Sequence, residues 1–233
     1  MATPKQGYIH NGEKYPGTTT VIGRFKDSGG LLHWAFAQGK LAEQGKIQKL
    51  YDKAEEAADI GTCAHAMIEA HINQLNPQAV LNTMLSDEEG RKKATNAFEL
   101  YLKWEKQTGI KLISKYQEIQ LVCPVFKFGG TPDAIGEIDG EIVLLDWKTS
   151  NGVYQDYIIQ LAAYRHLINN GVRMDDGKSL GFKVSKGAHL LRFAKEHPDF
   201  GHHYFGDLDE AWEQFTLFRK AYDIDKVLKK RAA

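Results

Sequence analysis

The pattern of apolar and polar positions predicts a helical first half of the chain. Three stretches are rich in Ala, Leu, Glu, Lys and Gln, which favour helices: residues 31–44, 57–73 and 87–107. Each stretch ends near a turn or breaker residue, namely Gly45, Pro77 or Gly109. We therefore expect three helices before residue 110.

The period changes near residue 112, where β-branched and aromatic residues begin to alternate with polar ones. This pattern predicts three strands, at residues 115–122, 127–138 and 141–148. The segments after them predict a helix at 154–169, short strands at 188–193 and 202–205, and a closing helix at 208–229.

Two dipeptides specify tight turns. Asn11-Gly12 separates residues 8–10 from residues 13–15, and Asp139-Gly140 separates the second and third predicted strands. Both dipeptides tolerate the positive φ angles of a two-residue type I′ turn. The sequence therefore predicts a β-hairpin at each place.

The order of these elements predicts an α/β fold, in which helices flank a mixed central β-sheet. No repeat or linker divides the chain, so we expect a single domain over residues 1–233. Within it, residues 1–110 form a mainly helical N-terminal part, 111–206 form the sheet core with the active site, and 207–233 form the closing helix.

Composition narrows the class of protein. Thirty basic residues balance 30 acidic ones, whereas many DNA-binding proteins are strongly basic. A site for divalent cations needs local acidic residues, so a zero net charge still permits a basic groove for DNA. The sequence has neither an apolar run long enough to cross a membrane nor a secretory leader. We therefore expect a cytoplasmic protein without a membrane partner.

The second hairpin predicts a pair of facing acids. If its two-residue turn pairs Ile138 with Glu141, Asp133 lies directly opposite Asp146 on the same face. Two carboxylates so close repel each other unless a cation lies between them. Hard cations such as Mg²⁺ bind one or two carboxylates together with waters and substrate phosphate.

Lys148 completes this cluster. Strand side chains alternate between faces, so Lys148 shares a face with Asp146 while Trp147 points to the other side. Hydrolysis of a phosphodiester needs cations that lower the pKa of the attacking water and stabilise charge in the transition state. The cluster therefore predicts a metal-dependent phosphodiesterase in which Lys148 orients water or stabilises charge.

A second Asp-x-Lys tripeptide lies at residues 176–178. Such a short pattern occurs by chance in a chain of this length. Asp176-Gly177-Lys178 lies in a polar turn with no strand and no opposed acid. We assign no chemical role to it, and a solvent-exposed sheet face remains the alternative interpretation of the first cluster.

These residues resemble the PD-(D/E)XK nuclease superfamily. Pro132 and Asp133 match its PD element, and Asp146 with Lys148 matches its (D/E)XK element. The resemblance implies a restriction-endonuclease-like core and a DNA substrate hydrolysed with Mg²⁺ or Mn²⁺.

Two further motifs are similar to the RecB-type exonucleases, a subgroup that includes the mitochondrial genome maintenance exonuclease and phage recombination nucleases. Gly61 and His65 match the motif G-x-x-x-H, and Gln160 and Tyr164 match Q-x-x-x-Y. The resemblance implies that His65, Asp133, Asp146 and the backbone carbonyl of Trp147 bind the metal. It also implies that Gln160 and Tyr164 support DNA or the active site.

His65, Gln160 and Tyr164 each have a structural interpretation as well, since a lone helical histidine usually packs and residues 158–168 form an apolar stripe. Glu69 lies one turn after His65 and is a candidate acceptor for its imidazole. Glu118, on the first predicted strand, is a candidate for the same cleft.

The subgroup implies a DNA exonuclease that acts on single- or double-stranded ends in phage-type recombination, repair or processing, within the host cytoplasm. Two cysteines, Cys63 and Cys123, are too few for a four-cysteine iron–sulfur cluster. No P-loop motif is present, so strand separation would come from a recombination or single-strand annealing partner.

Three alternatives remain open. A structure-specific or restriction-type endonuclease of the same superfamily would use the same three residues. A DNA-end-binding protein would keep the fold without catalysis, although both acids and the lysine are present here. Iron oxygenase chemistry would need a second histidine, and His202 and His203 lie far along the chain without a motif.

Overall fold

The computed structural model describes residues 4, 6–26, 29–46, 52–150, 152–193 and 200–232. Its helices are α1 (Thr18–Arg24), α2 (Gly29–Glu43), α3 (Asp52–Ile72), α4 (Pro77–Met84), α5 (Glu88–Thr108), α6 (Gln155–Asn170) and α7 (Asp209–Ala232), with a short 3-10 helix η1 (Ser114–Tyr116). Its strands are β1 (Tyr8–His10), β2 (Glu13–Tyr15), β3 (Lys111–Leu112), β4 (Leu121–Cys123), β5 (Phe128–Gly130), β6 (Ala134–Ile138), β7 (Glu141–Thr149), β8 (Val172–Arg173), β9 (Ala188–Phe193) and β10 (Phe200–Phe205).

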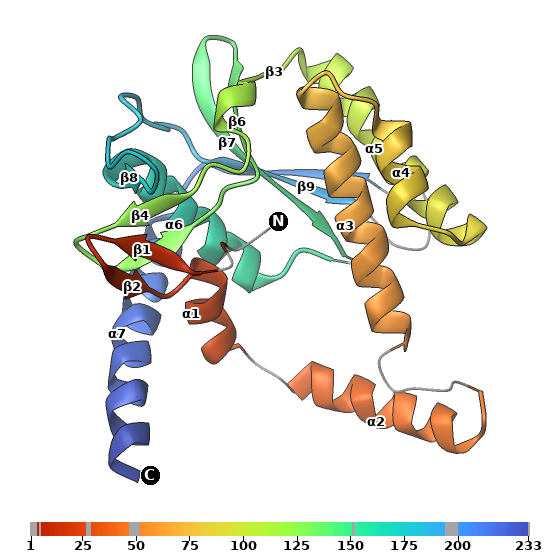
Figure 1. Ribbon diagram of the computed structural model, residues 1–233, viewed down its shortest axis with the longest axis horizontal. Coiled ribbons are helices and arrows are strands. Elements are labelled where there is room, and N and C mark those ends of the chain that lie inside the picture. The colour runs from red at the N-terminus through yellow and green to blue at the C-terminus, as the bar shows by residue number, and fades with distance from the viewer. Residues whose placement is uncertain are drawn as a thin grey trace.

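A five-stranded mixed sheet forms the centre, in the order β10-β9-β7-β6-β3. The β7–β9 pair is parallel and the other pairs are antiparallel. Helices cover both faces, with α1, α6 and α7 on one side and α3, α4 and α5 on the other (Figure 1). The predicted α/β fold with a mixed central sheet and flanking helices is therefore confirmed.

Two apolar cores lie on the two faces of the sheet. On one face, Leu144 and Leu190 pack with Leu161 of α6 and Phe215 of α7. On the other face, an aromatic and aliphatic cluster joins the sheet to α3 and α5: Ala64, Ile68, Tyr101, Trp104, Leu145, Trp147 and Leu191. Because alternate residues of β7 belong to different cores, each residue of this strand has its face fixed by packing.

Both predicted hairpins form. Asn11 and Gly12 have φ angles of 48° and 78°, and Asp139 and Gly140 have φ angles of 51° and 80°. The register of the first hairpin pairs His10 with Glu13, and that of the second pairs Ile138 with Glu141. Local turn chemistry therefore determines the register of the β6–β7 pair.

The strand predicted at 115–122 is wrong. Residues 114–116 form η1, and Glu118 has a φ angle of 46°, which extended strands do not adopt. Only Leu121–Cys123 is a strand, and it belongs to a separate three-stranded sheet in the order β5-β4-β8.

The strand predicted at 127–138 divides into β5 and β6, which lie in different sheets. Thr131-Pro132-Asp133 separates them, and proline lacks the N–H that a continuous ladder needs.

A helix was missed at Pro77–Met84, where Pro77 was interpreted only as a breaker. Proline suits the first position of a helix because that N–H has no helical partner. The side chain of Asn76 caps this helix by accepting a hydrogen bond from the Gln78 N–H at 2.9 Å.

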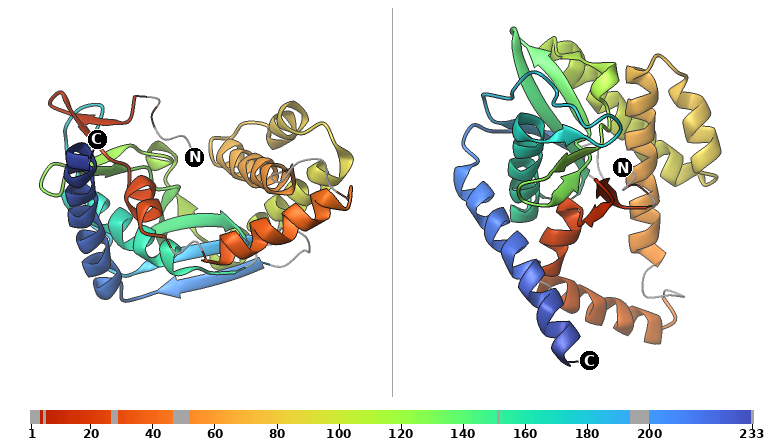
Figure 2. Two further views of the ribbon diagram at one scale, coloured as in Figure 1. Left: turned by 90° about the horizontal axis from the view of Figure 1, so that it is seen from below. Right: turned by 60° about the vertical axis from the view of Figure 1, so that its left-hand side comes forward.

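α2 lies apart from the two groups of helices and connects the α1 side of the molecule to α3 (Figures 1 and 2). Its Leu32 and Phe36 side chains are exposed. Among the described residues, no helix is long and apolar enough to span a membrane.

Candidate active site

The β6–β7 hairpin brings Asp133 and Asp146 together. The predicted register holds as far as Ala134, which pairs with Leu145, and Asp133 directly precedes Ala134. The backbone N–H of Trp147 donates to Oδ2 of Asp133 at 2.9 Å. Asp133 is 3% exposed and Asp146 is fully buried. Two acids from the two strands of one hairpin therefore lie together in a buried position.

Burial and mutual repulsion disfavour negative charge at this position. Burial raises the pKa of Asp133 well above its usual range, and the neighbouring charge of Asp146 raises it further. Lys148 and the Trp147 N–H act in the opposite direction but do not cancel the effect. Oδ1 of Asp146 is buried without a hydrogen-bond partner among the described residues. A cation bound between the two carboxylates would relieve both conditions.

Lys148 lies against Asp146, with its Nζ 2.5 Å from Oδ2. Burial tends to lower the pKa of Lys148, but the charges of Asp146 and Asp133 outweigh burial and raise the pKa. The same ammonium lies over the ring of Tyr157, 5.5 Å from its centroid. Lys148 is therefore a protonated cation at neutral pH, suited to orient water and stabilise negative charge rather than to accept a proton.

α6 lies on the same face as the two acids. Gln160 donates from Nε2 to the Tyr164 hydroxyl at 2.8 Å, and both side chains are buried. Burial raises the pKa of Tyr164 well above its usual range, and the charges of Asp146 and Asp133 contribute to this shift. The structure thus places Gln160 and Tyr164 together, and the Tyr164 hydroxyl interacts electrostatically with both carboxylates.

His65 reaches this region from α3, which covers the other face of the sheet. Gly61 permits the approach, because a Cβ at this position would lie 3.1 Å from Cβ of Thr149 at the end of β7. Burial lowers the pKa of His65 to about 3, and the positive charge of Lys148 adds to the effect. Nε2 of His65 is buried without a hydrogen-bond partner among the described residues. His65 is therefore a neutral imidazole near Lys148 with a free ring nitrogen.

Glu69 and Glu118 lie near one another. Burial raises the pKa of Glu69, and the charge of Glu118 contributes to the shift. The backbone N–H of Glu118 donates to the carbonyl of Asp133 at 3.2 Å. Glu118 is therefore next to the site, but in a turn rather than on the predicted strand. The role of Glu69 as an acceptor for His65 stays a prediction.

The available donors fit a hard divalent cation. In the described part of the chain, no three His, Cys, Asp or Glu residues form a compact metal-binding group. Two buried carboxylates, one with an unpartnered oxygen, suit a cation that keeps waters and takes phosphate oxygens as further ligands. The ligand set of His65, Asp133, Asp146 and the Trp147 carbonyl stays a prediction.

The N-terminal segment fastens the strand before Asp133, a contribution that sequence analysis missed. Thr18 donates from Oγ1 to the carbonyl of Gly129 at 2.9 Å, and the hydroxyls of Tyr8 and Thr131 lie 2.9 Å apart. A Cβ on Gly130 would lie 2.7 Å from Cε1 of Tyr164. The Gly129-Gly130 pair before Thr131 was the available signal, since adjacent glycines often mark a close approach of other segments.

Arg192 is a second residue that sequence analysis missed. Parallel pairing of β7 and β9 places Arg192 beside Lys148, and paired residues point to the same face. Its Nη1 group donates to the carbonyl of Ser150 at 3.2 Å, and Ser150 directly follows the strand that carries the Asp-x-Lys motif. The signal was an arginine between Leu191 and Phe193, in a strand, Ala188–Phe193, that is mainly apolar.

A small pocket of about 180 Å³ opens beside Gln160, between α1 and the start of α6. Tyr157, which contacts Lys148, also lines it. Lys26 and Asp156 lie at this pocket as an ion pair of 2.8 Å. This pocket therefore borders the residues that surround the two acids.

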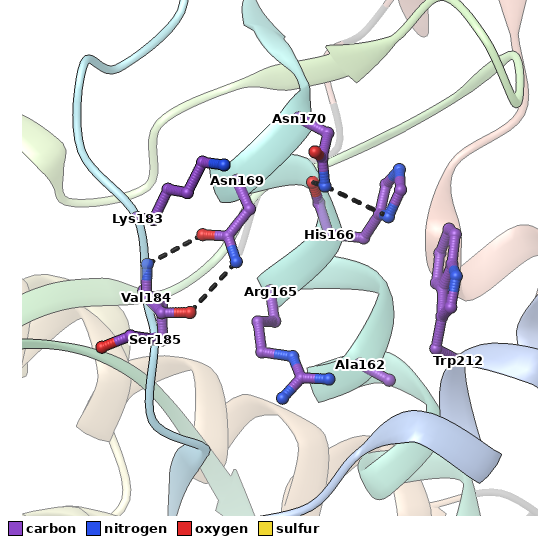
Figure 3. Close-up of a pocket in the computed structure, with 9 residues that line it drawn as sticks. All are labelled: Ala162, Arg165, His166, Asn169, Asn170, Lys183, Val184, Ser185 and Trp212. Atoms are coloured by element: carbon purple, nitrogen blue, oxygen red, sulfur yellow. Dashed lines mark hydrogen bonds between the residues drawn. The ribbon is translucent and has the colours of Figure 1, made fainter.

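A larger pocket, drawn in Figure 3, lies on the opposite side of α6. Asn169 exchanges hydrogen bonds with the backbone N–H and carbonyl of Val184, at 2.8 and 3.0 Å. His166 stacks on Trp212 with ring centroids 3.8 Å apart, and Arg165 pairs with Asp209 at 2.9 Å. These contacts fasten α6 to α7 and to the loop before β9, so we assign the pocket a structural role.

One comparison with known proteins identifies the family and agrees with the α/β fold. A model described as the PD-(D/E)XK nuclease superfamily matches residues 32–225. No curated protein matches the chain. A solved structure titled "Crystal structure of SSO0001" is 14% identical, over 73% of this chain and 74% of that one, with a TM-score of 0.33.

Proposed function

The chain belongs to the PD-(D/E)XK nuclease superfamily, and from this premise we propose that it is a divalent-metal-dependent DNA exonuclease of the RecB type. The observation that carries the proposal is the buried pair Asp133 and Asp146 with Lys148 against it. The proximity of His65 to Lys148, and of Tyr164 to both acids, supports the RecB-type assignment. Phage-type recombination, repair or processing is the proposed setting, with an annealing protein as the proposed partner.

Asp133 and Asp146 would hold Mg²⁺ or Mn²⁺, with His65 and the Trp147 carbonyl as further ligands. The bound cation would supply Lewis-acid stabilisation of the phosphate and a lowered pKa for the attacking water. Lys148 keeps its proton, so it orients the water through its N–H groups and balances the charge that develops on the phosphate.

Tyr164 and Gln160 would position the scissile phosphate, since the Tyr164 hydroxyl stays protonated and remains a hydrogen-bond donor. Arg192 extends the cationic face from Lys148 toward the sheet edge and supports the turn at Ser150. The pocket beside Gln160 would receive the DNA end, with Lys26 at its margin.

The test uses end-labelled single- and double-stranded DNA, incubated with Mg²⁺, Mn²⁺ or Ca²⁺ and resolved by length. We expect Mg²⁺ or Mn²⁺ to support stepwise shortening and Ca²⁺ to support binding at most. Excess chelator should abolish cleavage. Undiminished cleavage by purified protein in chelator would contradict the metal mechanism.

Two controls separate exonuclease from the alternatives. Linear DNA should be degraded while covalently closed circular DNA stays intact; cleavage of the circle would assign an endonuclease. The variant Asp146→Asn should be inactive and Asp176→Asn fully active. Equal residual cleavage by both variants would indicate a contaminant, and DNA-end binding without any cleavage by the wild-type protein would indicate an inactive relative.

A further inference from the structure

The closing helix α7 has an apolar stripe on its outer side. Its inner side packs against the body, where Phe215 is fully buried and its ring lies 4.7 Å from that of Phe128. Leu217, Ile224 and Leu228 on the outer side are 59%, 51% and 56% exposed. Single exposed apolar residues are common, but a row of them along one helix needs an explanation.

The spacing of the stripe matches a coiled-coil seam. Leu217, Ala221, Ile224 and Leu228, called the α7 stripe below, are separated by four, three and four residues. This alternation repeats every seven residues and keeps the side chains in line along a helix that packs on another helix. α7 runs along the outer edge of the molecule, so the stripe is accessible to a second molecule (Figures 1 and 2).

We propose that the α7 stripe is a homodimer interface, in which α7 of a second copy packs antiparallel to the first. In the register we propose, Leu217 lies opposite Leu228 of the second copy, and Ala221 lies opposite Ile224 of the second copy. The same contacts then occur twice around a two-fold axis, as a closed dimer requires. Every residue of the α7 stripe then contacts an apolar residue of the second copy, and the small side chain of Ala221 leaves room for the larger Ile224.

The distribution of charge along α7 favours a second copy of this chain as the partner, and an antiparallel orientation of the two helices. Glu210 and Glu213 are exposed near the start of α7, and Lys230 and Arg231 are exposed near its end. An antiparallel copy places the acidic end of each helix beside the basic end of the other, whereas a parallel copy brings like charges together. The helix dipoles also favour the antiparallel orientation, because it places the partially positive N-terminus of each helix beside the partially negative C-terminus of the other. Acidic and basic ends on one helix therefore complement a second copy of this chain.

Cysteine crosslinking in the full-length protein tests the register. We expect the double variant Leu217→Cys/Leu228→Cys to form a disulfide-linked dimer under mild oxidation, seen on a non-reducing gel. Neither single variant should crosslink, because neither position faces itself. The native Cys63 and Cys123 are buried, so they contribute little background. Crosslinking of Leu217→Cys without its partner would indicate a parallel pair and overturn the antiparallel register.

Light scattering over a wide concentration range tests the dimer itself. We expect the mass of the wild-type protein to double as concentration rises, and Ile224→Glu to stay monomeric with an unchanged circular dichroism spectrum. The matched control is Val125→Glu, which changes an 81% exposed residue outside α7 and should dimerise normally. A wild-type mass that stays monomeric at every concentration, or an Ile224→Glu variant that still dimerises, would overturn the proposal. Neither result would affect the proposed nuclease chemistry, which rests on other residues.

Discussion

Two Asp-x-Lys tripeptides occur in this chain and fold into opposite environments. Asp146 is fully buried in β7, beside Asp133 and against Lys148. Asp176 lies in a surface turn, where it accepts hydrogen bonds from Arg173 Nε at 2.9 Å and from the Lys178 N–H at 3.0 Å. The carboxylate of Asp176 is therefore neutralised by residues of its own turn, whereas Oδ1 of Asp146 has no hydrogen-bond partner among the described residues.

The difference indicates that the surroundings of an Asp-x-Lys tripeptide, rather than its sequence, decide whether it is suited to bind a metal. At Asp146, the hairpin supplies an opposed carboxylate, and α6 covers the same face with Gln160 and Tyr164. At Asp176, the chain turns: Gly177 has a φ angle of 68°, and its N–H donates to the carbonyl of Arg173 at 3.0 Å. Repulsion and burial, which would destabilise an ordinary protein position, make the first tripeptide suited to a metal.

The lysines give the largest expected contrast. Lys148→Ala should lower the cleavage rate by about 100- to 1,000-fold, because a positioned cation that stabilises charge in the transition state is lost. Metal and DNA binding should stay largely intact, since Lys148 lies outside the proposed ligand set. Lys178→Ala should leave the rate unchanged. Single-turnover assays and DNA-binding titrations on both variants measure these effects. Equal cleavage rates of the two variants would contradict a catalytic role for Lys148.

His65 gives the next effect, on metal affinity. His65→Ala should raise the Mn²⁺ concentration for half-maximal activity by at least about tenfold. Loss of a residue that only hydrogen-bonds to a metal ligand already weakens metal affinity by about this factor, and loss of a ligand should weaken it at least as much. Because burial lowers the pKa of His65 to about 3, the imidazole is neutral between pH 8 and pH 6. The difference in metal midpoint between wild type and variant should therefore stay constant over that range. A variant with a lowered melting temperature and a normal metal midpoint would assign His65 to packing.

Asp133 sharpens the comparison through stability. Its pKa is raised by burial and by Asp146, so an ionised Asp133 destabilises the metal-free protein at neutral pH. Asp133→Asn should therefore raise the melting temperature in chelator while abolishing activity. For a chain of this size, each kcal/mol corresponds to about 2–4 °C. Adding Mg²⁺ should stabilise the wild-type protein but not the variant, and a lower melting temperature of the variant in chelator would contradict this account.

Asp176 gives the smallest effect. Asp176→Ala removes an exposed ion pair with Arg173, so it should lower the free energy of unfolding by less than about 1 kcal/mol. Activity should not change. Urea unfolding monitored by circular dichroism measures the loss, and a loss of several kcal/mol would show that the turn has a role in folding that its exposure does not indicate.

The sequence predicted the parts of the site that depend on short-range geometry. Asp139-Gly140 fixed a two-residue turn, and strand periodicity carried that register to Asp133 and Asp146. Helical spacing placed Gln160 and Tyr164 one turn apart, where they now form a hydrogen bond. These relations involve residues joined by a single turn or a single helix, so local backbone preferences are enough to set them.

Only the tertiary structure decided which separate segments meet at the site. Strand pairing between β7 and β9 placed Arg192 beside Lys148, and the contact of Gly61 with Thr149 brought His65 toward the same place. The segment at 115–122 has the composition of a strand, yet it begins in the 3-10 helix η1 and turns at Glu118, which has a positive φ angle. Such contacts join residues far apart in sequence and depend on how whole faces bury their apolar surface. Local propensity carries no information about that choice, because each segment alone is compatible with several partners.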